Sequence, residues 1–116
     1  MTIKRFKVGP RMSQAVVCNG IAFLAGQVAD DPSQDVAGQT RQVLSAIDKL
    51  LGEAGTDKSR LLSANIFLAD MADFAAMNAV WDAWVSSGNT PARATVQAQL
   101  ARPQWRVEIV MTAALS

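Results

Sequence analysis

The sequence contains no histidine, no tyrosine and a single cysteine, Cys18. The absence of histidine excludes the Ser–His and Cys–His pairs that activate nucleophiles, and it removes the usual zinc-ligand sets. One cysteine can form neither an intramolecular disulfide nor a two-cysteine metal or redox motif. Because Cys18 lies in the apolar run of residues 15–18, we interpret it as an inert buried thiol. We therefore expect a protein that works without a metal ion or a cofactor.

Charge is scarce as well. Charged residues make up 18% of the chain and the formal net charge is +1, so the basic surface that nucleic-acid binding requires is missing. No apolar stretch approaches the roughly 20 residues that span a bilayer, and the basic start of the chain is not followed by the apolar segment of a signal peptide. We expect a cytoplasmic protein that binds neither nucleic acid nor a membrane. With 50% hydrophobic residues, the chain should form a single domain over residues 1–116.

Hydrophobic periodicity and turn residues predict the order strand, hairpin, helix, strand, helix, hairpin. Asn19-Gly20 is the strongest short hairpin signal and joins two β-rich runs. The apolar stripe of the first helix ends at Gly55, which suits the left-handed position after a helix. Asp70 resembles the N-cap of a second helix that ends before Gly88, and its aromatic stripe is interpreted as core. The predicted strands are residues 3–8, 14–18, 21–27, 61–68, 93–100 and 106–113, and the first helix spans residues 36–54.

The last two predicted strands carry the residues that suggest chemistry. Their strict alternation indicates half-buried strands, and we expect a hairpin in which Gln99 faces Arg106. In that register Arg93 and Glu108 share one face of the sheet, roughly 13 Å apart. A guanidinium can hold a carboxylate through two hydrogen bonds, and a nearby acid could move a proton or order a water. The alternative interpretation is that both side chains are only the solvated ends of strands.

The run of residues 21–25 is apolar on both of its faces, so each face of the sheet should be covered. Two helices can cover one face of a mixed sheet. The other face, which carries Phe23 or Leu24, is therefore expected to pack against neighbouring subunits.

Several short motifs follow one another in an ordered series. They are Gly26-Gln27 after an apolar strand, Gln39-Thr40 at a helix start, Ala54-Gly55 at its end, Asp70-Met71-x-Asp73-Phe74 with Asn78, Pro91-Ala92-Arg93 and Val107-Glu108-Ile109. In this order and spacing the sequence resembles the Rid (reactive intermediate deaminase, YjgF-like) family over nearly its whole length. The resemblance implies a chorismate-mutase-like α+β fold, with a six-stranded mixed sheet and two helices on one face. It also implies a homotrimer with ligand clefts at the subunit boundaries.

Characterised members of that family hydrolyse reactive enamines and imines to 2-keto acids and ammonia. By this resemblance, Arg93 binds the substrate carboxylate and Glu108 orders water or shuttles a proton, so both are candidate catalytic residues. Gly26 offers backbone hydrogen bonds to the ligand. Asn78 lies in a family motif and either contacts the ligand or stabilises the cleft wall. The implied partner is a small carboxylate substrate.

Three candidate substrate-binding positions depart from the family pattern. Met12 stands where a tyrosine is common, Ala25 where a serine is common, and Thr95 where a cysteine is common. The lost hydroxyls leave open the rate and the substrate of the deaminase reaction, and they place the chain with the divergent subfamilies. The alternative function is a trimeric binding module that holds a 2-keto or amino acid without turnover. Ribonuclease activity, reported for some relatives, has little support here, because histidine and a basic surface are both missing.

Overall fold

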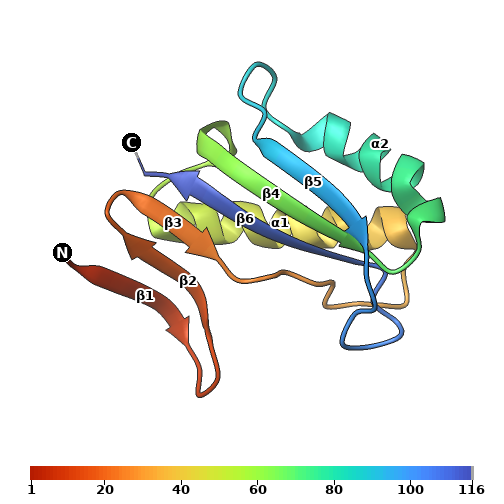
Figure 1. The fold of residues 1–116 in the computed structure, drawn as a ribbon, viewed down its shortest axis with the longest axis horizontal. Helices are drawn as coiled ribbons and strands as arrows, with labels where there is room; N and C mark the ends of the chain where they lie inside the picture. The colour runs from red at the N-terminus through yellow and green to blue at the C-terminus, as the bar shows by residue number, and fades with distance from the viewer. Residues whose placement is uncertain (116) are drawn as a thin grey trace.

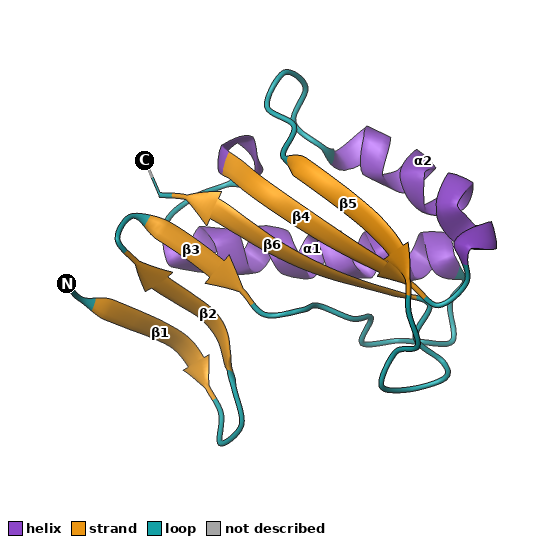
Figure 2. Cartoon of the chain, viewed as in Figure 1, coloured by secondary structure: helices purple, strands orange, loops and turns teal. Residues whose placement is uncertain are grey.

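The computed structural model describes residues 1–115 as a six-stranded mixed sheet with two helices on one face (Figure 1). The strands lie in the order β1-β2-β3-β6-β4-β5. Figure 2 shows α1 passing behind β6 and β4, with α2 beside it at the β5 edge. The elements are β1 (Ile3–Val8), β2 (Ser13–Cys18), β3 (Ile21–Leu24), α1 (Val36–Ala54), η1 (Lys58–Arg60), β4 (Leu61–Leu68), η2 (Met71–Asp73), α2 (Phe74–Trp84), β5 (Ala92–Gln97) and β6 (Val107–Ala114). Neither α-helix in this part of the chain is long and apolar enough to cross a membrane.

The turn between β2 and β3 and the two ends of α1 have the backbone conformations and caps that their positions require. Asn19 and Gly20 both have positive φ, 58° and 78°, in the two-residue turn between β2 and β3. Asp35 caps α1 by accepting a hydrogen bond from the Gly38 N–H. Gly55 ends the same helix with φ of 93°, in the left-handed region. Both ends of α1 therefore lie where the sequence predicts them.

The predicted terminal hairpin is wrong. β5 pairs in parallel with β4, and β6 lies between β3 and β4. The reason is that α2 connects β4 to β5, and a strand–helix–strand crossover of this kind brings its two strands together in parallel. β6 is central because its alternate residues from Val107 to Ala113 are all apolar and buried, whereas β5 is mostly exposed. Gln99 and Arg106, the predicted pair, both lie in the loop of residues 98–106.

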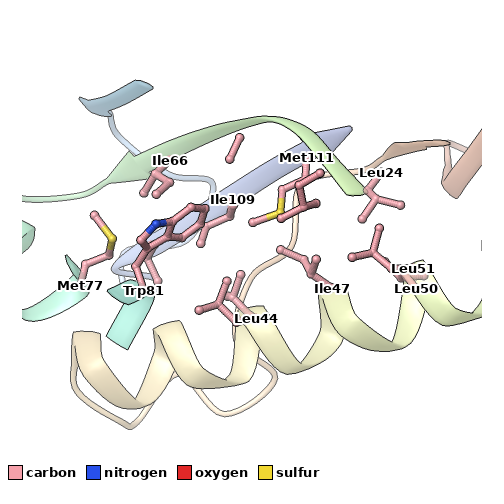
Figure 3. Close-up of a cluster of buried hydrophobic side chains, with 14 of the residues drawn as sticks. Leu24, Leu44, Ile47, Leu50, Leu51, Ile66, Met77, Trp81, Ile109 and Met111 are labelled. Atoms are coloured by element: carbon pink, nitrogen blue, oxygen red, sulfur yellow. The ribbon is translucent and has the colours of Figure 1, made fainter. Parts of the chain in front are cut away.

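The core lies between the helices and the sheet. Figure 3 shows Leu44 of α1 and Trp81 of α2 packed beneath Ile109 of β6. Met77 and Trp81 are buried, so the middle of the aromatic stripe is core, as predicted. Phe74, at the start of the stripe, is an exception and is 41% exposed.

The other face of the sheet is not covered by any element of residues 1–115. Phe23 lies on it with 47% of its surface exposed, whereas Leu24 points into the core. The strand register aligns Phe23 with Val16 of β2 and Thr112 of β6. An apolar side chain thus stands in the middle of a face that carries few charges.

A buried glutamine, Gln39, ties three segments together. Its Nε2 lies 3.0–3.1 Å from the carbonyl oxygens of Pro32, Gln34 and Gln104. Its Oε1 accepts a hydrogen bond of 2.9 Å from the Arg106 N–H. The amide therefore links the start of α1 to the loop before it and to the loop that leads into β6.

Replacing Gln39 with alanine should lower the free energy of unfolding by about 3 kcal/mol. The reason is that the Arg106 N–H and the carbonyl oxygens bound by Gln39 would lose their buried hydrogen-bond partner. Urea unfolding measures this loss. Gln42→Ala is the matched control, since Gln42 makes only exposed hydrogen bonds, to Asp31, and should cost less than about 1 kcal/mol. Equal losses in the two variants would show that the Gln39 contacts do not hold these segments.

Candidate functional site

The predicted site residues fall into two groups, of which the first surrounds Glu108. This Glu108 group consists of Glu108 on β6 with Ala25 and Gly26, the residues directly after β3. The chain rejoins β6 through a bridge in which the Gln27 N–H donates to the Ile109 carbonyl at 2.9 Å. The bend of residues 25–26 is thereby held beside the half-buried Glu108 side chain.

Gly26 closely approaches the Glu108 side chain. A Cβ atom at this position would overlap Oε2 of Glu108 and lie 3.0 Å from its carboxyl carbon. Any larger residue would displace the carboxylate, because real Cβ contacts do not come this close. The backbone of Gly26 and the carboxylate of Glu108 therefore border the same small space.

The second group lies between β5 and α2 and consists of Arg93, Thr95, Asn78 and Trp81. Arg93 and Thr95 are two residues apart on β5 and share the face that α2 covers. The guanidinium of Arg93 lies over the Trp81 ring. Asn78 lies on α2 one turn before Trp81. We refer to these four residues as the Arg93 group.

The Arg93 guanidinium lies over the Trp81 ring and has no acidic partner among residues 1–115. Its central carbon is 5.2 Å from the centroid of the Trp81 ring. Within residues 1–115, no acidic side chain forms a salt bridge with it. The N–H donors of a guanidinium project in its plane, so stacking on an indole leaves them available for an anion. Sequence periodicity identifies Trp81 only as a core residue; its contact with Arg93 depends on the β4–α2–β5 crossover.

Two buried oxygens on α2 and β5 have no hydrogen-bond partner among residues 1–115. They are Oδ1 of Asn78 and Oγ1 of Thr95. A buried polar atom without a partner costs about 1–3 kcal/mol, and such atoms in native proteins require an explanation. Both oxygens are shielded from solvent in this structure.

The two groups lie on opposite faces of the sheet. Arg93 aligns with Ala64, which is buried on the helix side, and Glu108 aligns with Phe67, which belongs to the uncovered face. The predicted shared face is therefore wrong, because it assumed that β5 and β6 pair. Since β4 lies between them, one subunit does not bring Arg93 and Glu108 to the same small molecule.

Met12 belongs to neither group by its described contacts. It lies in the turn between β1 and β2, is 48% exposed, and accepts a 2.8 Å hydrogen bond from the Gly9 N–H through its carbonyl. A hollow of about 660 Å³ lies elsewhere, between α1 and α2, with Arg41 and Trp84 among its lining residues. None of the predicted site residues lines that hollow.

The carboxyl groups with displaced pKa values also lie outside both groups. Hydrogen bonds from the Ser33 hydroxyl and N–H lower the pKa of Asp31, and those from Ser59 lower the pKa of Asp57. Both are exposed carboxylates in tight turns, so the cause is local capping. The described part of the chain holds no group of three or more acidic or thiol side chains placed to bind a metal ion.

Comparison with known proteins shows the family. The profile of the family described as Endoribonuclease L-PSP matches residues 2–115. A RutC family protein from Haemophilus ducreyi is 53% identical over 114 residues, which cover 98% of this chain and 97% of that protein. The RutC family protein YoaB from Escherichia coli is 45% identical over 115 residues, covering 99% of this chain and 100% of YoaB.

Solved structures agree with these sequence matches. A YjgF family member from Neisseria meningitidis has a TM-score of 0.98 and 52% identity, and the match covers 100% of this chain and 97% of that one. The Rid family protein YyfA from Yersinia pestis has a TM-score of 0.84 and 33% identity, with 92% and 89% covered. The chain therefore belongs to the Endoribonuclease L-PSP family, together with the RutC, YjgF and Rid proteins, and has their chorismate-mutase-like fold.

Proposed function

We propose that this protein hydrolyses reactive enamine and imine intermediates to 2-keto acids and ammonia, at sites formed between the subunits of a homotrimer. The observation that carries the proposal is the Arg93 guanidinium, which lies over the Trp81 ring and is free of acidic partners among residues 1–115. A guanidinium in this state is ready to hold a carboxylate by two parallel hydrogen bonds. A 2-imino acid carries such a carboxylate next to its reacting carbon.

The separation of the two groups supports a shared site. Glu108 lies on the uncovered face, and Arg93 lies at the β5 edge on the helix side. Packing of the uncovered faces around a threefold axis would bring the β5 edge of one subunit toward the Glu108 group of the next. The cleft is then completed by assembly, and neither group acts alone.

The reaction requires only that the protein orient the substrate and supply one acid–base group. Arg93 binds the carboxylate and fixes the orientation of the imine. Glu108 takes a proton from a water as the water oxygen adds to the imine carbon, and it then returns a proton to the nitrogen. Glu108 next transfers the hydroxyl proton of this adduct to the nitrogen, the C–N bond breaks, ammonia leaves, and the carbonyl of the 2-keto acid forms. The Gly26 backbone lies beside Glu108 and would contact the same ligand.

Composition counts against ribonuclease activity, although the family description names an endoribonuclease. The chain has no histidine to act as a base, and its formal net charge is only +1. Phosphate backbones are bound chiefly by clustered Lys and Arg side chains. A small carboxylate held by one arginine fits this chain better.

The uncovered face should hold the trimer together. Phe23→Asp places a carboxylate in the middle of this face, and we expect dissociation because burying an unpaired charge is unfavourable. Light scattering at micromolar concentration measures the mass. Ser45→Asp adds the same charge on the exposed side of α1 and should leave the trimer intact. A monomeric wild-type protein would contradict the proposed assembly.

Arg93→Lys should weaken the binding of pyruvate, used as a 2-keto acid probe, by roughly tenfold or more, because charge-assisted hydrogen bonds contribute ~1.5–3 kcal/mol. Calorimetry measures the affinity. Arg102→Lys is the matched control, since Arg102 also lies over an indole, that of Trp105, but outside both groups. Wild-type affinity in a folded Arg93→Lys protein would make the arginine structural.

The alternative, a binding module without turnover, is favoured by the missing hydroxyls at Met12 and Ala25. If these losses limit catalysis, the double variant Met12→Tyr, Ala25→Ser should hydrolyse an imine of the 2-aminoacrylate type faster than the wild type. Trapping the imine with semicarbazide measures the rate. An unchanged rate together with intact pyruvate binding would favour the binding module.

A further inference from the structure

Arg93 forms one end of a column of four side chains, each in contact with the next. Its guanidinium carbon lies 5.2 Å from the Trp81 ring, and the Trp81 and Trp84 rings are 5.6 Å apart with a tilt of 52°. Nζ of Lys58 lies 5.2 Å from the Trp84 ring at the other end. The column runs from the edge strand β5, past α2, to the short turn after α1.

The middle of the column is rigid. Trp81 is only 5% exposed and packs among the core side chains (Figure 3). Nε1 of Trp84 donates to Oδ2 of Asp48 at 2.9 Å, and Nζ of Lys58 donates to the Trp84 carbonyl at 2.6 Å. The indole beneath Arg93 is therefore fixed both by the core and by a neighbour that is itself anchored to α1.

Arg93, by contrast, depends on this indole for its orientation. It stands on an exposed edge strand, and among residues 1–115 its side chain makes neither a hydrogen bond nor a salt bridge. A free arginine samples many rotamers, and immobilising it on binding lowers the affinity. Stacking on an indole face restricts those rotamers before the ligand arrives.

We propose that Trp81 is a positioning residue, which holds the Arg93 guanidinium flat so that its N–H edge meets the carboxylate of the substrate. This inference rests on the proposed function of Arg93 as the carboxylate anchor. The Arg93 guanidinium lies over the indole ring, and its N–H donors, which project in its own plane, stay available to an anion.

Replacing Trp81 with leucine should raise KM for an imine substrate and Kd for pyruvate by about tenfold, with kcat changed less than about twofold. Trp81→Phe keeps an aromatic face and should stay within about threefold of the wild type. Trp105→Leu removes the indole under Arg102, an equivalent pair at 5.3 Å outside the site, and should leave both constants unchanged. Trp81→Met serves as a second ring-free variant if the leucine variant does not fold.

A second measurement reports the position of Arg93 without relying on activity. In an NMR spectrum the Arg93 Nε–H signal should show an upfield ring-current shift in the wild type and in Trp81→Phe, and lose it in the ring-free variants. A wild-type protein that binds no pyruvate and hydrolyses no imine would overturn the proposed function, while the NMR shift would still show whether Trp81 holds Arg93. A ring-free variant that loses the shift but keeps wild-type KM and Kd would overturn the positioning role, as would a wild-type protein without the shift.

Discussion

The buried amide of Gln39 is the contact on which the rest of the architecture depends. It accepts from the Arg106 N–H and donates toward carbonyls on two loops, so it fixes where the chain enters β6. β6 is the central strand, and its entry point sets the pairing with both β3 and β4. Glu108 follows Arg106 by two residues, so a polar contact in the core also determines where the carboxylate of the candidate site lies.

The Glu108 group and the Arg93 group lie on opposite faces of the sheet because of the connection between β4 and β5. The β4–α2–β5 crossover takes Arg93 to the sheet edge and brings α2 beneath it, and it leaves the place beside β4 to β6 and Glu108. The crossover therefore gives Arg93 its aromatic support and at the same time separates it from the acid. Under the proposed function, each subunit carries both halves of the site, and contact between subunits joins them.

Local signals in the sequence predict the elements but not their pairing. Turn and cap residues such as Asn19 and Gly55 act within a few bonds, so the hairpin and the end of α1 can be predicted from them. Asp70, predicted as the N-cap of the second helix, instead caps the short 3-10 turn η2, and α2 begins at Phe74. The partner of a strand depends on contacts far along the chain, which alternation alone does not encode. One usable signal was present: the inner face of β6 is wholly apolar, as in a central strand, while Arg93 and Thr95 mark β5 as an edge. The Trp81–Arg93 contact could be predicted only once β5 is recognised as an edge strand rather than the partner of β6.

The positions of the cations on the sheet have a consequence for how copies of this chain meet. Both edge strands carry positive charge, with Lys4, Arg5 and Lys7 on β1 and Arg93 on β5. Charged side chains on edge strands discourage another strand from adding there, and like charges at both ends oppose the joining of two sheets edge to edge. The weakly charged face around Phe23 has no such barrier. Continuous sheets, which lead to fibres, are thereby disfavoured, and closed face-to-face assemblies remain accessible.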